Sequence, residues 1–311
     1  TRMAQLQIVT EESSSKIRQF GKDAVVAAKE VGSSATELMR SSETWARLGY
    51  NLENSLKMAK VTAAFANVAD TSVEQGTESM TSILKAYEFD PSKLEYVSDV
   101  LVNLGKKYAV SGEELGIAFQ NAGAALEAGG NTFEESAALI TAGNAAVQDA
   151  SKVGNALKTS SLRIRGSKAE LEDMGEEIDD FCESSSKLRN EIKALTGGKV
   201  DIMFANGQTY KSMYQIMLDI ASVWDSMSDI NQAALLVDIA GKRNASVMKS
   251  IITNLGDLKG AYKDAFESTG TTMKSNEIAL DTIDGKMKQL SATFQGWSKD
   301  IGLEGLIKLI L

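Results

Sequence analysis

The stretch that decides the fold is SGEELGIAFQNAGAALEAGG, residues 111–130, followed directly by NTFEESAALITAGNAAV, residues 131–147. Each half opens with a capping box, in which a Ser or Thr side chain accepts from the backbone N–H three residues on and a Glu there reaches back. The boxes are Ser111…Glu114 and Thr132…Glu135, and Gly129-Gly130 provides a helix stop. Both halves are rich in Ala and Gly, which lets helix axes approach closely. The stretch therefore predicts two capped, closely packed α-helices.

The same signals recur along the chain. Further capping boxes are expected at Thr71…Glu74, Ser167…Glu170 and, in a looser form, Asp229…Gln232, while Asp90-Pro91 pairs an N-cap with proline at the first helical position. The expected helices span about 2–31, 51–69, 73–88, 91–108, 112–128, 133–148, 151–165, 168–180, 185–195, 210–226, 230–254 and 272–300.

One segment has a different pattern. Residues 199–204 alternate polar and apolar side chains, and Asn206-Gly207 follows before Gln208-Thr-Tyr210. An Asn-Gly pair between such runs favours a hairpin, because both central turn residues need positive φ. We therefore expect a small two-stranded ribbon within 199–210. The predicted fold class is all-α, a multi-helix bundle or elongated helical array with one short β-hairpin.

The pattern divides the chain into four segments. These are an N-terminal helical arm (1–44), a core of small-residue helices (45–196), the hairpin with further helices (197–265) and a C-terminal heptad helix (266–311). The apolar ending of the chain and its start without Met suggest that it is part of a longer protein.

The C-terminal helix carries apolar residues at 3-4 spacing from Met273 onward, with Asn276 as a polar break. This spacing is typical of a coiled-coil or bundle seam. We predict an oligomer seam, and hence a homo-oligomer, through Leu280, Ile283, Met287, Leu290, Phe294, Trp297 and Ile301. The alternative is that this helix folds back on residues 2–31 of its own chain. A similar series with a polar middle runs there through Met3, Leu6, Thr10, Ser13, Ile17, Phe20, Ala24, Ala27 and Val31.

Composition argues against catalysis. The 311 residues include no His and one Cys, Cys182, so neither an imidazole-dependent site nor an internal disulfide can form. The pairs of carboxylates are adjacent in sequence: Glu113/Glu114, Glu134/Glu135, Glu176/Glu177 and Asp179/Asp180. Neighbouring side chains on a helix point about 100° apart, so such a pair cannot flank one glycosidic bond as the two carboxylates of a glycosidase do. No phosphate-binding glycine loop is present. We expect no enzyme activity, no cofactor, and no catalytic, cofactor-binding or metal-binding residues.

Charge and hydropathy exclude two further classes of partner. A formal net charge of −9 argues against specific nucleic-acid binding, because a binder needs a basic face. A local basic cluster at Arg163, Arg165 and Lys168 is followed at once by acidic residues. No run of about 18 apolar residues occurs, so we expect no membrane span within this segment.

Several stretches, taken in order, resemble one protein family. They are Trp45-Ala-Arg-Leu-Gly-Tyr50, the helix 59–69, Tyr108–Leu115, Gly130–Ser136, Gly143-Asn144, Val153–Arg165, Leu171–Gly175, Asn206-Gly207 and Ile239–Asn244. The most specific is Val153-Gly-Asn-Ala-Leu-Lys-Thr-Ser-Ser-Leu-Arg-Ile-Arg165. In the last stretch Ala240 stands where the family usually has an aromatic residue. From about residue 45 to 300 the chain resembles the core region of tail tape measure proteins of long-tailed phages and prophages.

The resemblance implies a structural protein inside the tail tube that sets tail length and takes part in tail-tip opening and DNA ejection. It implies the tail tube lumen of the virion as location, with the host cytoplasm during assembly. The implied partners are the tail tube protein, tail-tip or baseplate proteins and tail assembly chaperones. It carries over no catalytic residue. Two other classes remain open, a helical coiled-coil adaptor or signalling module of a bacterial cell, and a cell-wall enzyme whose catalytic domain lies outside these residues.

Overall fold

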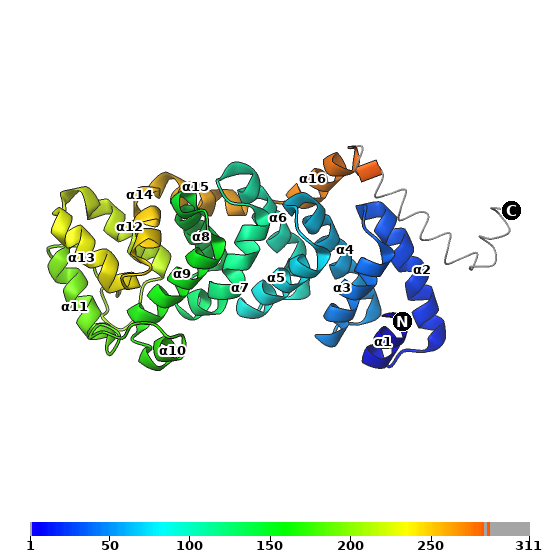
Figure 1. Ribbon diagram of the computed structural model, residues 1–311, viewed down its shortest axis with the longest axis horizontal. Helices are drawn as coiled ribbons and strands as arrows, with labels where there is room; N and C mark the ends of the chain where they lie inside the picture. Colours follow the sequence, from blue (N-terminus) through cyan, green and yellow to red (C-terminus); the bar gives the residue numbers. More distant parts are fainter. Residues whose placement is uncertain (1, 283–284, 287–311) are drawn as a thin grey trace. The chain divides into compact units, whose positions relative to one another are not determined.

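The computed structural model describes residues 2–282, 285 and 286, and this part of the chain is all-α. It contains sixteen α-helices and two short 3₁₀ helices, η1 and η2. Figure 1 shows the α-helices labelled in chain order. The predicted all-α class is confirmed.

The chain divides into two compact units, each discontinuous in sequence. The described residues of the first unit fall within Thr1–Thr81, Asp90–Val102 and Thr269–Leu311. Those of the second fall within Ser82–Phe89 and Asn103–Ser268. Two of the boundaries lie inside helices, α5 (Val73–Ala86) and α6 (Leu94–Lys107).

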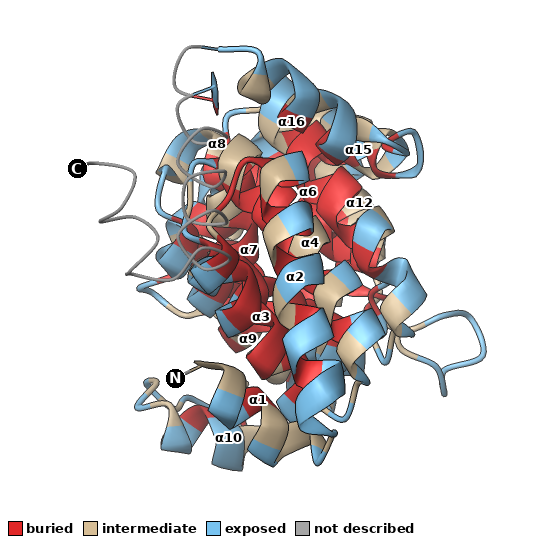
Figure 2. Ribbon diagram, turned by 90° about the vertical axis from the view of Figure 1, so that its right-hand side faces the viewer, coloured by how far each residue is buried: buried red, intermediate tan, exposed pale blue. Residues whose placement is uncertain are grey.

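The first unit is built around α3 and α4. Its helices are α1 (Arg2–Thr10), α2 (Ser14–Val31), α3 (Ala35–Arg47), α4 (Leu52–Ala69), the first part of α5, η1 (Pro91–Lys93), the first part of α6 and α16 (Thr271–Leu280). Helix α3 packs against α1, α2 and α4, and α16 packs against α4 and α2. Figure 2 shows how much of α3 is buried and how much of the outer face of α2 is exposed. The core includes Leu6, Phe20, Leu38, Trp45 and Phe65.

Helix α3 is absent from the predicted helices because part of its buried face is polar. Ser41 lies inside the unit, with its Oγ 3.0 Å from Thr62 Oγ1 and 2.8 Å from Thr77 Oγ1. Glu43 is also buried, and it accepts hydrogen bonds from Arg2 and Arg47. Such residues satisfy one another within the core, but they interrupt the apolar periodicity that predicts a helix.

The second unit is arranged around α8 (Phe133–Val147), the helix formed by the second half of the fold-deciding stretch. Helix α8 packs against α7, α9, α12, α14 and α15, and every residue from Glu135 to Asn144 is buried. The other helices that lie wholly in this unit are α7 (Gly112–Ala128), α9 (Ala150–Arg165), α10 (Lys168–Asp173), α11 (Ser185–Leu195), α12 (Met213–Val223), η2 (Trp224–Ser226), α13 (Asp229–Ala240), α14 (Ala245–Thr253) and α15 (Leu255–Phe266).

The close helix approach predicted for the small-residue region is seen between α7 and α9. A Cβ atom placed on Gly154 of α9 would lie 2.8 Å from the backbone oxygen of Ala118 and 2.8 Å from Cβ of Asn121. Real Cβ contacts are longer than this, so the two backbones approach to a distance that only glycine permits. Gly154 is part of the most specific stretch, Val153–Arg165.

The capping pattern is correct at the fold-deciding stretch. Ser111 with Glu114 and Thr132 with Glu135 form complete capping boxes at the starts of α7 and α8. Asp90 caps the turn at Pro91 as expected, although that turn is 3₁₀. Two boxes that the prediction missed, Ser34 with Glu37 and Ser212 with Gln215, start α3 and α12.

Three of the predicted caps are wrong. Ser72, not Thr71, accepts from the backbone N–H of Gln75, and Ser228, not Asp229, caps α13. Ser167 makes no side-chain capping hydrogen bond at α10. In the first two cases a Ser next to the predicted residue can also cap the helix. The sequence pattern therefore leaves the position of the N-cap uncertain by one residue.

The predicted ribbon within 199–210 is wrong, because no strand forms in the described residues and one isolated antiparallel bridge joins Met203 to Tyr210. The backbone groups that would extend a ladder have other partners. The Asn206 Oδ1 atom accepts from the backbone N–H of Thr209, which a longer ladder would direct to the Phe204 oxygen, and that oxygen accepts from the N–H of Gly207 instead. This segment is therefore a bridged loop.

Several predicted helices are shorter or divided. The span 2–31 is interrupted by Glu11, whose φ is 55°, and the span 230–254 is interrupted at Gly241, whose φ is 73°. The span 168–180 ends at Asp173, and 210–226 starts at Met213. Helix α15 was not predicted. Of the span 272–300, α16 covers Thr271–Leu280, and most of the remainder lies outside the described residues.

Candidate interaction groove

Of the predicted oligomer seam, the structure describes Leu280, while Ile283, Met287, Leu290, Phe294, Trp297 and Ile301 lie outside the described residues. Leu280 is half-buried at the end of α16, and its side chain fills the space where a Cβ of Gly32 would lie. Gly32 is the residue that ends α2. The start of the series therefore lies against the chain's own first unit, and the seam itself stays a prediction.

Asn276, the polar break in that series, is also held within the first unit. Its side chain is buried, and its Oδ1 accepts a hydrogen bond of 3.2 Å from Nδ2 of Asn67 on α4. The same Nδ2 donates to the backbone oxygen of Val31, the last residue of α2. One amide group therefore connects α16, α4 and the end of α2.

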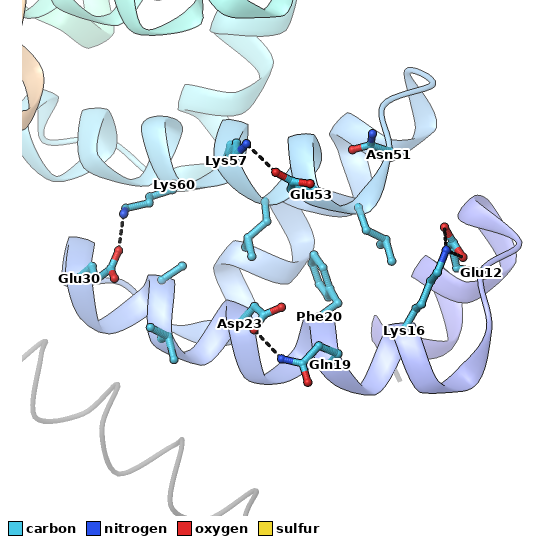
Figure 3. A pocket seen from close by; sticks show the side chains of 14 residues that line it. Glu12, Lys16, Gln19, Phe20, Asp23, Glu30, Asn51, Glu53, Lys57 and Lys60 are labelled. Carbon is cyan, nitrogen blue, oxygen red and sulfur yellow. Dashed lines mark hydrogen bonds and ion pairs between the residues drawn. The ribbon is translucent and has the colours of Figure 1, made fainter.

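A groove of about 760 Å³ runs between α2 and α4 in the first unit. Phe20 and Ala27 of α2 are buried at its floor, and Leu52 and Leu56 of α4 are half-buried there. Val26, which also lines the groove, is 57% exposed. Figure 3 shows Phe20 projecting from α2 into the space between the two helices. The floor is thus an apolar strip with part of its surface open to water.

Charged side chains line both sides of this strip. Glu30 of α2 forms an ion pair with Lys60 of α4 at one end, and Lys16 pairs with Glu12 at the other (Figure 3). On α4, Lys57 lies 2.7 Å from Glu53, and this hydrogen bond and charge lower the pKa of the Glu53 carboxyl below its ordinary value. An apolar floor between charged rims is the geometry that accepts the apolar face of an amphipathic helix.

The sequence contained only part of the signal for this groove. Of the predicted series, Ile17, Phe20, Ala24, Ala27 and Val31 form the buried face of α2, Leu6 is buried on α1, and Ser13 is exposed. The groove itself depends on α4, which lies beside α2 although α3 separates the two in sequence. No spacing within one helix indicates which other helix provides the second wall.

The second unit contains a buried polar cluster around the specific stretch Val153–Arg165. Arg163 of α9 is 1% exposed. Its guanidinium donates to Asp179 Oδ2 at 2.6 Å, to Cys182 Sγ at 2.9 Å and to the backbone oxygen of Asp238 at 3.0 Å. Burial raises the pKa of the Cys182 thiol, which disfavours the reactive thiolate. The cluster therefore joins α9 to the segment after α10 and to α13.

Arg165, two residues beyond Arg163 on α9, is also used within the unit. It donates to the backbone oxygen of Gly129 at the end of α7, and its guanidinium carbon lies 4.2 Å from the centre of the Tyr210 ring. Stacking of this kind is a cation–π contact. Together the two arginines of the stretch hold four segments against α9: the segment after α10, α13, the end of α7 and the loop of Tyr210.

The adjacent carboxylates that were considered for catalysis have structural partners. Glu114 and Glu135 complete capping boxes, and Asp179 binds Arg163. Within residues 2–282, 285 and 286, no group of three or more Asp, Glu, Cys or His side chains is placed to hold a metal ion. None of the helices in that same part of the chain combines the length and apolar character needed to cross a bilayer.

The family described as phage-related minor tail protein matches residues 14–241, which run from the start of α2 to the end of α13. No solved structure matches the chain.

Proposed function

Because the chain belongs to the phage-related minor tail protein family, a family of structural tail proteins, we propose that it is part of a tail tape measure protein. The whole tape measure protein would lie in the lumen of the tail tube, set tail length during assembly and take part in tail-tip opening and DNA ejection. The observation that carries the proposal is the family match over residues 14–241, which includes most of the stretches that resemble tape measure proteins.

The packing of those stretches supports a shared folded core. Gly154 permits the close approach of α7 and α9, and Arg163 and Arg165 bind the segments around α9. Each of these residues acts through geometry that another side chain cannot reproduce, since glycine lacks a Cβ and arginine supplies a planar fork of donors. A core of this kind is expected wherever the same fold is used.

The length of the helices supports the proposal that these residues form a compact part of the tape. The longest described helices, α2 and α4, have 18 residues each, so each spans about 27 Å at 1.5 Å per residue. A ruler of tail length needs a long, continuous rise. We therefore propose that residues 2–282 fold as two compact units that anchor or initiate the assembly, and that length is measured by other parts of the protein.

The partners follow from this location. We propose contacts with the tail tube protein along the lumen, with tail-tip or baseplate proteins at the end where assembly starts, and with tail assembly chaperones before the tube closes. These contacts can be tested by co-purifying the tagged full-length protein from cells that produce tails. Recovery of the tube and tip proteins with the tagged chain supports the proposal.

The decisive experiment is genetic. Disrupting the gene in a phage or prophage that carries it should abolish tails or give tube polymers of irregular length in electron micrographs. Complementation with the intact gene should restore tails of uniform length. Tails of normal length in the disrupted strain would contradict the proposal. Detection of the chain in the cytoplasm of cells that make no tails would favour the adaptor or signalling class instead.

A further inference from the structure

The pair Asn206-Gly207, which the sequence pattern singles out, lies at the tip of an exposed loop. Every residue from Phe204 to Thr209 is exposed. Gly207 has a positive φ of 66°, and no described atom lies within 4 Å of the position that its Cβ would take. The chain contains no other Asn-Gly pair. The peptide bond between Asn206 and Gly207 is therefore open to water.

The base of this loop is held by contacts outside the tip. Arg189 of α11 donates two hydrogen bonds of 2.7 Å to the Asp201 carboxylate. At the other end, the Tyr210 hydroxyl donates to Ser185 Oγ, and the Tyr210 ring stacks on Arg165 of α9. A chemical change at the tip can therefore occur while both ends of the loop stay in place.

The tip itself is closed by hydrogen bonds among its own residues. Asn206 Oδ1 accepts from the backbone N–H groups of Gln208 and Thr209, and Asn206 Nδ2 donates to Thr209 Oγ1 at 3.0 Å. The Gly207 N–H donates to the backbone oxygen of Phe204. Because all these groups belong to exposed residues, water can replace each partner, and opening of the tip costs little free energy.

We propose that Asn206 is a site of spontaneous deamidation in the folded protein. When the tip opens, the Gly207 nitrogen gives up its proton to water and forms a bond to Cγ of Asn206, which closes a succinimide ring. The Cγ–Nδ2 bond breaks, and Nδ2 takes up a proton and leaves as ammonia. Water then hydrolyses the ring at one of its two carbonyl groups and yields either aspartate or isoaspartate at position 206. Glycine favours ring closure because residue 207 has no side chain to obstruct it. The inference does not depend on the proposed role in the tail.

The two products have different effects on the loop. An aspartate carboxylate still accepts from the N–H groups of Gln208 and Thr209, so the tip stays closed and gains one negative charge. Isoaspartate adds a methylene group to the main chain, which displaces these N–H groups relative to Phe204 and breaks the closure. The modification therefore places a charge beside Phe204, whose side chain is 41% exposed, and in its isoaspartate form it also opens the tip.

Peptide mapping by mass spectrometry, after incubation at mildly alkaline pH, tests the site in the whole chain. Asn206 should lose its amide in the folded chain at a rate within about tenfold of its rate in guanidinium chloride, because an exposed tip opens at little cost. Asn54-Ser55 is the internal control. Asn54 is also exposed, but Ser55 is buried and its N–H donates to the Asn51 oxygen in the first turn of α4, so the fold should protect Asn54 far more strongly. Retention of the Asn206 amide by the folded chain, while the unfolded chain loses it, would overturn the proposal.

An enzymatic probe for isoaspartate gives a second readout. Protein isoaspartate methyltransferase with labelled S-adenosylmethionine should label the peptide that contains position 206 in the incubated parent chain. Asn206→Gln is the matched variant, because it keeps the amide but its longer side chain would have to close a larger ring, which forms more slowly. That variant should take up no label in this peptide. Equal labelling of the two chains in this peptide, or labelling of neither, would contradict the assignment.

Discussion

Arg163 Nη2 lies 2.6 Å from Oδ2 of Asp179, and the arginine is almost completely buried while the aspartate side chain is 41% exposed. One charge is therefore removed from water, and its partner remains at the surface. Although burial on its own raises the pKa of the Asp179 carboxyl, the hydrogen bond and charge of Arg163 outweigh it and lower the pKa below its ordinary value. Asp179 is the charged partner on which the buried guanidinium depends.

The first prediction follows from this dependence. Asp179→Asn should destabilise the chain by about 1–3 kcal/mol, because a buried guanidinium loses its counter-charge, with solvent at Asp179 limiting the effect. Urea unfolding followed by circular dichroism measures the change. Asp180→Asn, a neighbouring exposed aspartate, should change stability by less than about 0.5 kcal/mol. Equal effects of the two variants would contradict the assigned role of Asp179.

The second prediction concerns pH. Burial raises the pKa of the Asp238 carboxyl to about 6, and the carboxylates of Glu191 and Asp179 add to the shift while Arg163 opposes it. An unfolded aspartate titrates near pH 3.9, so between about pH 4 and 6 the folded state binds more protons than the unfolded state. The contribution of this group to stability therefore falls as pH rises through that window.

Asp238→Asn should remove this dependence. The variant should be more stable than the parent by about 1 kcal/mol at pH 7, a value reduced for the half-exposed position, and should differ little near pH 4. Unfolding curves at several pH values provide the measurement. Glu191→Gln should act in the same direction with a smaller effect, because it removes one of the two carboxylates that raise the pKa. A parent and an Asp238→Asn variant with parallel pH profiles would refute the assignment.

The third prediction tests the close approach of α7 and α9. Gly154→Ala should cost about 1–3 kcal/mol, because its Cβ would overlap the backbone of Ala118 and the side chain of Asn121. Gly256→Ala in α15 is the control, since nothing lies within 4 Å of the added Cβ. Alanine is the better helix former, so that variant should be stabilised by about 0.5–1 kcal/mol. Thermal unfolding of both variants should therefore show a lower melting temperature for Gly154→Ala and a higher one for Gly256→Ala than for the parent chain.

What could be predicted from the sequence was local. The boxes Ser111…Glu114 and Thr132…Glu135 join residues three apart, so the pattern contains the whole interaction. The ribbon failed because the side chain of Asn206 and the N–H of Gly207 bind backbone groups that strand pairing would use. Helix α3 was missed because Ser41 is satisfied by Thr62 and Thr77, residues that are distant in sequence.

The interaction groove and the arginine cluster were beyond sequence reasoning for a related reason. Both depend on which helices become neighbours in the tertiary structure. The specific stretch Val153–Arg165 contains Arg163 and Arg165, but their partners, Asp179, Asp238, Gly129 and Tyr210, lie outside it. Likewise, the apolar face of α2 was visible as a series, whereas the contribution of α4 to the groove was not.

The fourth prediction is that the purified chain does not hydrolyse peptidoglycan. The sequence has no His, and among its adjacent carboxylates Glu114 and Glu135 complete capping boxes while Asp179 binds Arg163. Incubation with purified peptidoglycan should release no more soluble fragments than buffer alone. Release that is lost when one specific Glu is changed to Gln would reveal a site formed by carboxylates that are distant in sequence.

The last prediction is that the chain does not retard duplex DNA in electrophoresis, even at low salt. The formal net charge is −9, and like charges repel. The one local basic cluster noted in the sequence does not present a free cationic face. Arg163 is buried on Asp179, and Arg165 is stacked on Tyr210. Lys168 lies 3.5 Å from Glu183 and 3.9 Å from Glu172.

A charge-reversed variant makes this test sensitive. Glu172 and Glu183 are about half exposed, so Glu172→Lys combined with Glu183→Lys should leave the fold intact while releasing Lys168 and adding two cations beside it. This variant should retard DNA at low salt, and the retardation should disappear as salt rises, because phosphate binding depends on the release of counterions. Retardation by the parent chain would contradict the prediction, and it would require a basic face formed elsewhere on the protein. Absence of retardation by the parent, with retardation by the variant, would mean that the acidic partners of Lys168 keep this surface from binding DNA.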